Sequence, residues 1–523
     1  MKTQFQYGED RLTTSIALEI ARGNITGLLS PKQIKKINAS RNCVDEIIEA
    51  TKPVYGINTG FGPLCNTMIS KEDTSTLQHN ILKSHSVGVG DDIPLYISKL
   101  MLILKLHSLA QAYSGISLTT LRRIQWHIDN DVISVVPEKG SVGASGDLAP
   151  LAHLFLPLIG LGKVNYKDEY VETSYILQKE GMSSLQLGGK EGLALINGTQ
   201  FIAAFAVCVV EKLYSCLSQA DIIGALMIEG LLGSSSPFLP QLHQLRPYPG
   251  NLHVASRVSS FLSGSEIVKS HENCDRVQDP YSLRCIPQVH GASRTSWLHL
   301  KELLEIELNA VTDNPVIFSA EETISGGNFH GQPLALPLDY ACIGASEIGN
   351  ISDRRTYLSL IGMVKGVPKL LMTDAGINSA FMMLQYTTAA LASENKGLCF
   401  PASADSIPTS LGQEDHVSMG SIGGRKALSV CQNVEKILAI EMICAAQSFD
   451  YHRPLKSSKI LEAVHAYIRT IIPHIEEDRV FSDDINLAIK IIEAKTVIHI
   501  ANDASQEDEM SFQSDYESLF ESY

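Results

Sequence analysis

The segment GSVGASGDLAP, at positions 140–150, contains the residues with the most unusual chemical potential in the chain. In Ala144-Ser145-Gly146 the glycine amide nitrogen follows the alanine carbonyl by two residues, and a tight bend could press these atoms together. Glycine suits this approach because it lacks a Cβ. Loss of one water would close a five-membered ring, and loss of the Ser145 hydroxyl as a second water would leave an electrophilic exocyclic methylene. An ordinary surface turn is the alternative, since glycine and serine are common turn residues.

Other polar residues are of the types that a reaction at such an electrophile would need. Tyr55, in the Gly-rich segment YGINTGFGP, could act as a base if its surroundings lower its pKa, or it could simply fill the turn. Arg284 could bind a substrate carboxylate with Tyr281 one helical turn before it, although a surface ion pair is the alternative. Asn197 interrupts an apolar stretch and, if buried, needs hydrogen-bond partners.

The segments around these residues closely resemble the aromatic amino acid ammonia lyases and aminomutases, which carry a 4-methylidene-imidazol-5-one (MIO) group. The resemblance follows the family's order along almost the whole chain, and it favours the electrophile over an ordinary turn at 144–146. The segments that carry it are VYGINTGFGP (54–63), LQHNILKSHSVGVG (77–90), GSVGASGDLAPLAH (140–153), EGLALINGTQ (191–200), VQDPYSLRCIPQVHG (277–291), TDNPVIF (312–318), SGGNFHG (325–331) and GQEDHVSMG (412–420).

The resemblance implies an MIO group formed autocatalytically from Ala144, Ser145 and Gly146, with no pyridoxal phosphate and no nucleotide. It implies that Tyr55 is the catalytic base. It also implies that Tyr281 is a further catalytic residue and that Arg284 binds the substrate carboxylate. The remaining residues that it assigns to the substrate pocket are Asn197, Gln278 and Phe329.

Two positions indicate the substrate, namely His85 and Glu414. An imidazole has one donor and one acceptor nitrogen, so it suits such polar partners. A phenyl substrate would leave them unpaired at a cost of about 1–3 kcal/mol per group. Relatives acting on phenylalanine or tyrosine usually carry Gln at the Glu414 position. The chain therefore resembles the histidine branch, which implies conversion of L-histidine to trans-urocanate and ammonia, the first step of histidine degradation.

Other functions stay open at this point. Ser-His at 84–85 occurs in some tyrosine enzymes, and Gln332 stands where Glu is commoner in histidine enzymes. A tyrosine or phenylalanine ammonia-lyase or 2,3-aminomutase is therefore the first alternative. A non-catalytic helical scaffold is the second, but it would be expected to have lost Ser145, Tyr55 or Arg284, and all three are present.

The hydrophobic pattern predicts a mostly α protein. The first 200 residues mix short helices with Gly-rich turns, and strand-like alternation is scarce. Later stretches show apolar residues at helical spacing over long distances. They cover residues 200–233, 296–311, 334–365 and 425–449.

The resemblance implies a fold of the fumarase/aspartase-like superfamily, in which a globular part with the MIO loop precedes a long central helical bundle. We accordingly expect an N-terminal MIO-loop domain over 1–200 and a helical-bundle domain over 201–505. Residues 506–523 are acidic and rich in serine, which predicts a disordered tail.

Composition limits the partners and the compartment. Lys and Arg number 42 and Asp and Glu 57, which gives a net charge of −15 and argues against nucleic acid or an anionic membrane as a partner. Ten cysteines without a C-x-x-C pair are typical of a reduced, cytoplasmic protein. The apolar run 193–210 is a poor membrane span because Asn197 to Gln200 interrupt it. The histidines show no metal-ligand spacing, so we assign no metal.

The chain is also expected to form an oligomer. A charged fraction of only 19% suits a protein with large buried interfaces. The resemblance implies a homotetramer whose active sites combine segments from different subunits and bind a small-molecule substrate, an amino acid. The alternative is that a single folded chain gathers the candidate residues, which are spread from position 55 to position 414.

Overall fold

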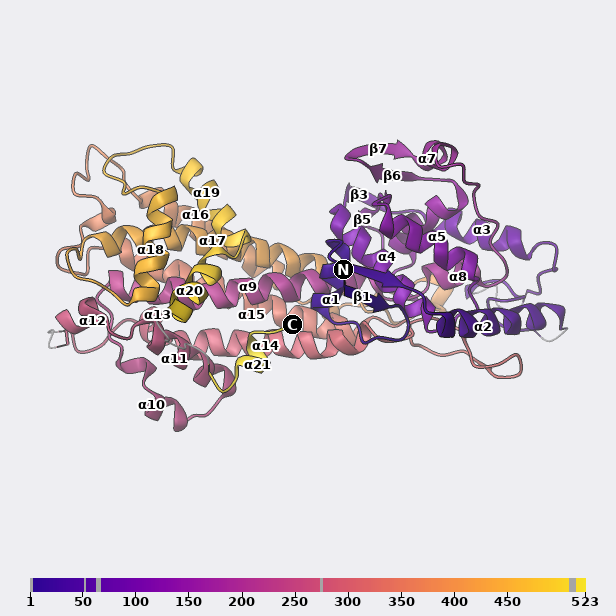
Figure 1. The fold of residues 1–523 in the computed structure, drawn as a ribbon, viewed down its shortest axis with the longest axis horizontal. Helices are drawn as coiled ribbons and strands as arrows, with labels where there is room; N and C mark the ends of the chain where they lie inside the picture. Colours follow the sequence, from indigo (N-terminus) through magenta and orange to yellow (C-terminus); the bar gives the residue numbers. More distant parts are fainter. Residues whose placement is uncertain (1–2, 51–52, 63–66, 273–275, 508–513) are drawn as a thin grey trace.

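The computed structural model describes residues 3–50, 53–62, 67–272, 276–507 and 514–523, and most of them lie in helices. The mostly α fold predicted from the sequence is thereby confirmed. Elements before residue 197 gather at one end of the molecule, drawn in indigo and violet in Figure 1. They are β1 (Thr3–Gln6), α1 (Thr14–Ala21), β2 (Ile25–Leu28), α2 (Pro31–Glu49), α3 (Thr74–His85), β3 (Val89–Asp92), α4 (Leu95–Ala110), α5 (Leu118–Asp129), β4 (Ile133–Ser134), β5 (Pro137–Lys139), α6 (Leu148–Phe155), η2 (Leu156–Ile159), β6 (Lys163–Tyr166), β7 (Glu169–Glu172), α7 (Thr173–Lys179) and α8 (Glu191–Ile196).

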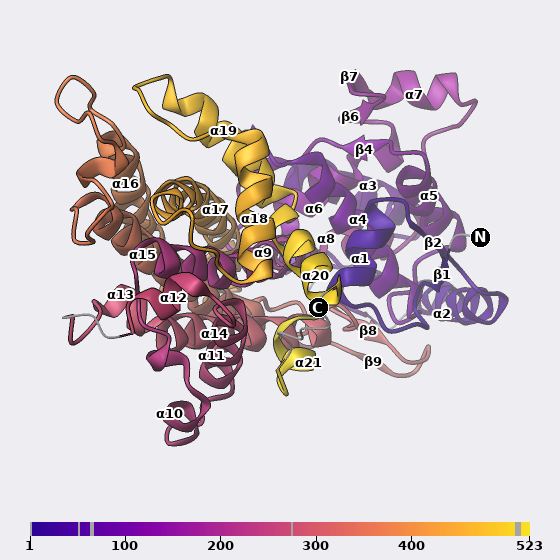
Figure 2. The same ribbon diagram turned by 60° about the vertical axis from the view of Figure 1, so that its left-hand side comes forward.

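Four long helices form a bundle that extends away from this end (Figures 1 and 2). They are α9 (Gln200–Gly230), α14 (Ile286–Glu307), α15 (Gln332–Leu360) and α17 (Gly420–Asp450). Helix α9 is long and apolar enough to cross a membrane, but 83% of its most apolar window is buried inside the protein. A helix that is covered on all sides is apolar all round, so its composition is explained by its place in the core.

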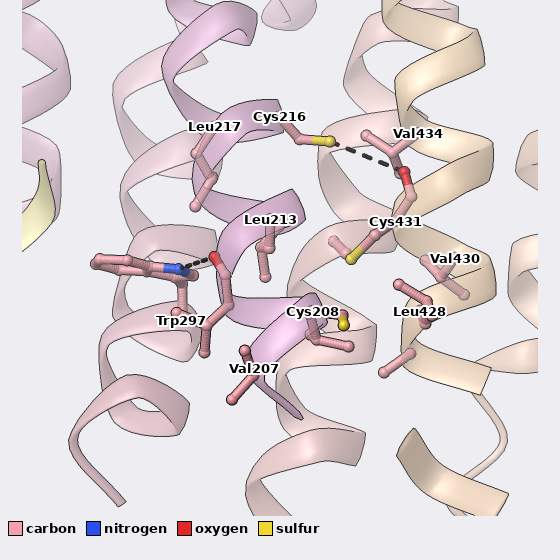
Figure 3. Packing of buried hydrophobic residues seen from close by; sticks show 14 of the residues in the cluster. Val207, Cys208, Leu213, Cys216, Leu217, Trp297, Leu428, Val430, Cys431 and Val434 are labelled. Carbon is pink, nitrogen blue, oxygen red and sulfur yellow. Dashed lines mark hydrogen bonds between the residues drawn. The ribbon is translucent and has the colours of Figure 1, made fainter. Parts of the chain in front are cut away.

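Apolar side chains make up most of the interior of the bundle, although buried ion pairs such as Arg355 with Glu441 also lie within it. In Figure 3, Cys208, Leu213 and Cys216 of α9 lie beside side chains of α17, including Val430 and Val434. Trp297 of α14 is fully buried, and its indole nitrogen donates to the carbonyl oxygen of Val210 at 2.9 Å. The one polar atom of this large side chain is therefore paired, as burial requires.

Shorter helices cover the bundle, and the strands form only small sheets. β1 and β2 pair in parallel, β3 with β5 and β8 with β9 pair antiparallel, and β4, β6 and β7 form a three-stranded sheet. The remaining elements are η3 (Ser236–Phe238), α10 (Pro240–Gln244), α11 (Pro249–Phe261), α12 (Glu266–Ser270), α13 (Tyr281–Arg284), β8 (Val316–Ile317), β9 (Thr323–Ile324), η4 (Lys369–Leu371), α16 (Met382–Leu398), η5 (Ala402–Ala404), η6 (Ser410–Gly412), α18 (Lys459–Ile471), α19 (Phe481–Glu493), α20 (Thr496–Glu507) and α21 (Glu517–Phe520).

The end of the chain differs from its prediction. Helix α20 continues to residue 507, and residues 514–523 pack against the bundle instead of forming a disordered tail, while 508–513 lie outside the described residues. Phe520 is buried beside the ring of His253, and Glu521 is paired with buried cations. Acidic composition favours disorder only where the carboxylates have no buried partners.

Candidate active site

The turn at 140–147 joins β5 to α6 and has an unusually tight backbone. Gly140, Gly143 and Gly146 have positive φ, and Ser145, which is not a glycine, has φ of 50°. A Cβ added to Gly146 would lie 2.1 Å from the carbonyl oxygen of Gly198, so no other residue fits there. The backbone is therefore held in a strained bend at the three residues that were predicted to cyclise.

The break between α8 and α9 holds one side of this turn. The Asn197 side-chain amide donates to the carbonyl oxygen of Ser145 at 3.1 Å, and the Gly198 amide donates to the same oxygen at 3.3 Å. In return, the Asp147 amide donates to the Gly198 carbonyl at 2.7 Å. Two donors thus converge on the Ser145 carbonyl. The Oδ1 atom of Asn197 is buried with no protein partner within the described part of the chain.

Asp147 fixes the turn to the start of α9. Its Oδ2 atom accepts from the amides of Phe201 and Ile202, both at 3.0 Å. Burial raises the pKa of Asp147 to about 7, although these hydrogen bonds oppose the change. The free amides at a helix N-terminus are a favourable place for a carboxylate, so the turn and α9 are held as one unit.

The segment 409–421 covers the other side of the turn. Ser145 Oγ donates to Glu414 Oε1 at 2.6 Å, and Thr409 Oγ1 donates to the other carboxylate oxygen at 3.1 Å. The Met419 amide donates to the carbonyl of Val142 at 3.0 Å. Ser145 and Glu414, which were assigned to different tasks from the sequence, are therefore in direct contact, although 269 positions separate the two residues.

His85, Tyr55 and Phe329 lie on elements beside the same turn. His85 is the last residue of α3. Burial lowers its pKa, whereas a backbone hydrogen bond and the nearby charge of Glu414 raise it.

Tyr55 lies close to the segment that carries Glu414. Its hydroxyl accepts from the Gly62 amide at 3.2 Å, and a Cβ added to Gly62 would lie 3.8 Å from Ser410 Oγ. Phe329 precedes His330, whose Nε2 lies 3.1 Å from the carbonyl oxygen of His416.

The predicted carboxylate clamp lies elsewhere. Gln278, Tyr281 and Arg284 form a cluster in which Arg284 donates to Gln278 Oε1 at 3.1 Å and stacks 4.6 Å above the Tyr281 ring. Arg276, just before them, donates to the Leu231 carbonyl beyond the C-terminal end of α9 at 3.1 Å. Helix α13 accordingly lies at the opposite end of the bundle from α6 and α8 (Figures 1 and 2).

The length of α9 shows how far apart the two groups are. The turn with Ser145 meets the first residues of α9, and the clamp meets the last, with 31 residues between these ends. At a rise of 1.5 Å per residue this separation is about 45 Å. The alternative that one folded chain gathers every candidate residue is therefore wrong.

Several buried polar residues around the turn were not predicted. Lys105 of α4 and Asp147 are the most important, and both are almost fully buried. A signal for Lys105 exists in the sequence, because it stands alone among apolar residues in LMLILKLHSLA. Asp147 precedes an apolar run as a helix-capping acid would, but it caps α9 and not its own helix. Over the described ranges, no group of three or more His, Cys, Asp or Glu residues could hold a metal ion.

A helical bundle that presses an Ala-Ser-Gly turn between a helix start and a carboxylate is an architecture of enzymes that eliminate ammonia from amino acids. The chain belongs to the aromatic amino acid lyase family, which it matches over residues 12–470. It is 42% identical over 497 residues to a histidine ammonia-lyase of Myxococcus xanthus, covering 95% of this chain and 98% of that one. It is 43% identical over 498 residues to the histidine ammonia-lyase of Homo sapiens, covering 94% and 76%.

Solved structures agree with this assignment. The histidine ammonia-lyase of Trypanosoma cruzi superposes with a TM-score of 0.89 at 36% identity, covering 99% of this chain and 97% of that one. A tyrosine aminomutase from Streptomyces globisporus superposes with a TM-score of 0.89 at 33% identity, covering 96% and 99%. The helical-bundle fold that the sequence resemblance implied is confirmed.

Proposed function

We propose that this protein converts L-histidine to trans-urocanate and ammonia without oxidation. The observation that carries the proposal is the position of the Glu414 carboxylate, which lies 2.6 Å from Ser145 Oγ. The same carboxylate is near His85, because its charge acts to raise the pKa of that histidine. An imidazole ring can donate its N–H group to this half-buried carboxylate, whereas a phenyl ring has no polar group to offer it. The many histidine ammonia-lyases among the relatives support the same substrate.

We infer that residues 144–146 cyclise to the MIO group of the family. The amide nitrogen of Gly146 would bond to the carbonyl carbon of Ala144, releasing its oxygen as water, and the Ser145 hydroxyl would leave as a second water. The strained Ser145 backbone, the glycine contact at 146 and the two donors on the Ser145 carbonyl all suit such a ring. When formed, the group supplies an electrophile that turns the substrate amine into a leaving group.

The residues around the turn have separate tasks in this proposal. Tyr55 would take the β-proton of the substrate, and its position beside the 410–414 segment supports that assignment. Asn197 supports charge on the Ser145 carbonyl through its amide nitrogen, while its unpaired Oδ1 faces no protein donor within the described residues. Glu414 and His85 would hold the imidazole. Phe329 would pack beside the ring on the adjacent segment.

Assembly is needed to complete this site. Arg284 is the residue proposed to bind the substrate carboxylate, yet it lies about 45 Å from the turn in the same chain by the length of α9. Its neighbours are open to solvent, with Val277 95% exposed. Three exposed apolar side chains, Leu336, Tyr340 and Ile343, also follow one face of α15. We therefore propose a homotetramer in which Gln278, Tyr281 and Arg284 of one subunit complete the site of another.

The proposed location is the cytoplasm. The cysteines within the described part of the chain are all free thiols, in agreement with a reducing compartment.

Substrate tests decide the proposal. Purified protein is incubated separately with histidine, tyrosine and phenylalanine, and the conjugated product is followed by ultraviolet absorption. We expect turnover of histidine to exceed that of the other two, and a preference for tyrosine or phenylalanine would refute the proposal. Glu414→Gln, which keeps the shape but removes the charge, should lower kcat/KM for histidine about ten- to a hundred-fold. An unchanged value would indicate a structural role and make Gln332 the better guide to specificity.

A further inference from the structure

A buried lysine lies directly behind the pair of donors that bind the Ser145 carbonyl. Lys105, in the middle of α4, is 1% exposed. Its ammonium group donates to the main-chain carbonyl oxygen of Asn197 and lies 3.4 Å from Gln200 Oε1. The amide nitrogen of Gln200 donates to Thr312 Oγ1 at 2.9 Å, which turns its oxygen toward the lysine. Burying a cation costs free energy, so a lysine at this position is expected to have a structural or functional role.

The carbonyl that Lys105 binds belongs to the peptide unit between Asn197 and Gly198. The other end of the same unit is the Gly198 N–H group, which donates to the Ser145 carbonyl at 3.3 Å. A positive charge on the oxygen of an amide draws electrons from its nitrogen and makes the N–H a stronger donor. The ammonium of Lys105 and the carbonyl of Ser145 are thus connected through one planar peptide group.

The position of this peptide depends on such an anchor. Residues 197–199 are outside both α8 and α9, and Gly198 has φ of 132°. The Asn197 amide still donates to the Leu193 carbonyl at 2.9 Å, but the peptide unit between Asn197 and Gly198 pairs with Lys105 and with Ser145. A Cβ on Gly198 would lie 2.6 Å from Gln200 Oε1 and 2.8 Å from Thr312 Oγ1. The break is therefore clamped between the turn at Ser145 on one side and the group around Lys105 on the other.

Nearby carboxylates oppose the loss of charge that burial favours at Lys105. Burial lowers the pKa of Lys105 to about 7, the carboxylates of Asp313 and Asp147 act to raise it, and the ammonium of Lys190 lowers it. Lys190 is itself paired with Asp313 at 2.6 Å. The ion pair of Lys190 with Asp313 thus lies near Lys105, and the negative charge of Asp313 limits the cost of burying this lysine.

We propose that Lys105 is a positioning residue: its ammonium fixes and polarises the Asn197–Gly198 peptide, and thereby strengthens the hydrogen bond on the Ser145 carbonyl. The inference rests on the proposed function, because that carbonyl is part of the proposed MIO ring. Nothing in the geometry brings Lys105 to the substrate. Its effect is on how strongly the ring attracts a nucleophile.

The test measures the electrophile without turnover. Wild type, Lys105→Met and Lys105→Arg are purified, and intact mass shows which chains have lost two waters. Cyanide, whose carbon would bond to the methylidene carbon with uptake of a proton, is then added without substrate. The rate at which each cyclised, folded chain gains one HCN is followed by mass spectrometry. Lys99→Met is the matched control, because Lys99 is a mostly buried lysine on the same helix that pairs with Asp131.

We expect the cyanide rate constant to fall about ten-fold in Lys105→Met, a change of the size that the loss of one hydrogen bond produces. The rate constant of Lys105→Arg, which keeps the charge, should be closer to that of wild type. The rate constant of Lys99→Met should equal that of wild type. A wild-type rate in Lys105→Met, or an equal loss in Lys99→Met, would overturn the inference. If Lys105→Met does not fold, Lys105→Gln is measured in its place with the same two outcomes. A wild-type protein at its full encoded mass would instead refute the proposed MIO group.

Discussion

The C-terminal segment offers a prediction whose size follows from the structure. Glu521, with a side chain 8% exposed, lies 2.9 Å from His253 Nε2 and 3.4 Å from Arg294 Nη2, and accepts from Ser218 Oγ at 2.7 Å. Burial raises the pKa of Glu521, but Arg257, His253 and Arg294 together lower it to about 2. The charged carboxylate therefore fastens residues 514–523 to the bundle.

The lowered pKa gives the scale of the effect. A change from the ordinary value of 4.5 to about 2, at 1.36 kcal/mol for each pKa unit, corresponds to about 3 kcal/mol of docking free energy at neutral pH. Since the folded-state pKa is below the unfolded one, this stabilisation is fully present above about pH 4.5. It is lost as the pH falls toward about 2. Glu521→Gln should remove most of it at neutral pH, where the loss would raise local opening about a hundred-fold.

Hydrogen exchange read by mass spectrometry can measure this opening in the intact assembly. The amides of Phe520 and Glu521 donate to the carbonyls of Tyr516 and Glu517, so they report on the segment directly. Glu517→Gln is the matched control, because burial raises the pKa of Glu517 and its charge contributes no comparable stabilisation. Exchange in Glu521→Gln at the wild-type rate, or equal acceleration in both variants, would refute the reasoning.

Three further predictions concern the site. Intact mass of wild type should show the loss of two waters, and Ser145→Ala should not show it. The variant should lose activity by orders of magnitude while its circular dichroism spectrum is unchanged; full encoded mass in active wild type would contradict this. Arg284→Lys keeps the charge but not the planar fork, so kcat/KM should fall strongly, and near-normal kinetics would exclude Arg284 as the clamp. Inactive Ser145→Ala and Arg284→Ala chains, when co-assembled, should regain part of the activity because some sites receive both intact residues; no recovery in mixed tetramers would exclude shared sites.

Sequence reasoning predicted helical periodicity well. The stretches at 200–233 and 425–449 correspond to α9 and α17, because their apolar residues recur at helical spacing. The start of α14 at Ile286 was missed by ten residues, since IPQVHG contains Pro and Gly. Pro287 is tolerated in the first turn of the helix. Gly291 packs closely against Gly250 of α11, because a Cβ added to Gly250 would lie 2.3 Å from the carbonyl oxygen of Gly291.

Contacts between distant segments were harder to predict. The contact between Ser145 and Glu414 was not predicted, because each residue was assigned separately and no local pattern links them. Lys105 was missed because a lysine in an apolar helix has many explanations until its partner, the Asn197 carbonyl, is known. The docked C-terminal residues were missed because their acidic composition does not reveal the buried arginines opposite them.

The long α9 helix explains why the two halves of the proposed site are separate in one chain. Its N-terminal end receives the Asp147 carboxylate and its C-terminal end the Arg276 guanidinium, as the direction of the helix dipole favours. An antiparallel arrangement of two such helices would place the turn of one subunit opposite the clamp of the other. A packed bundle holds both ends at a fixed distance, so the electrophile and the carboxylate-binding residue would be positioned by rigid elements. If Arg284 binds the substrate carboxylate, the chemistry requires an oligomer, because no movement of a single chain short of unfolding the bundle closes a gap of about 45 Å.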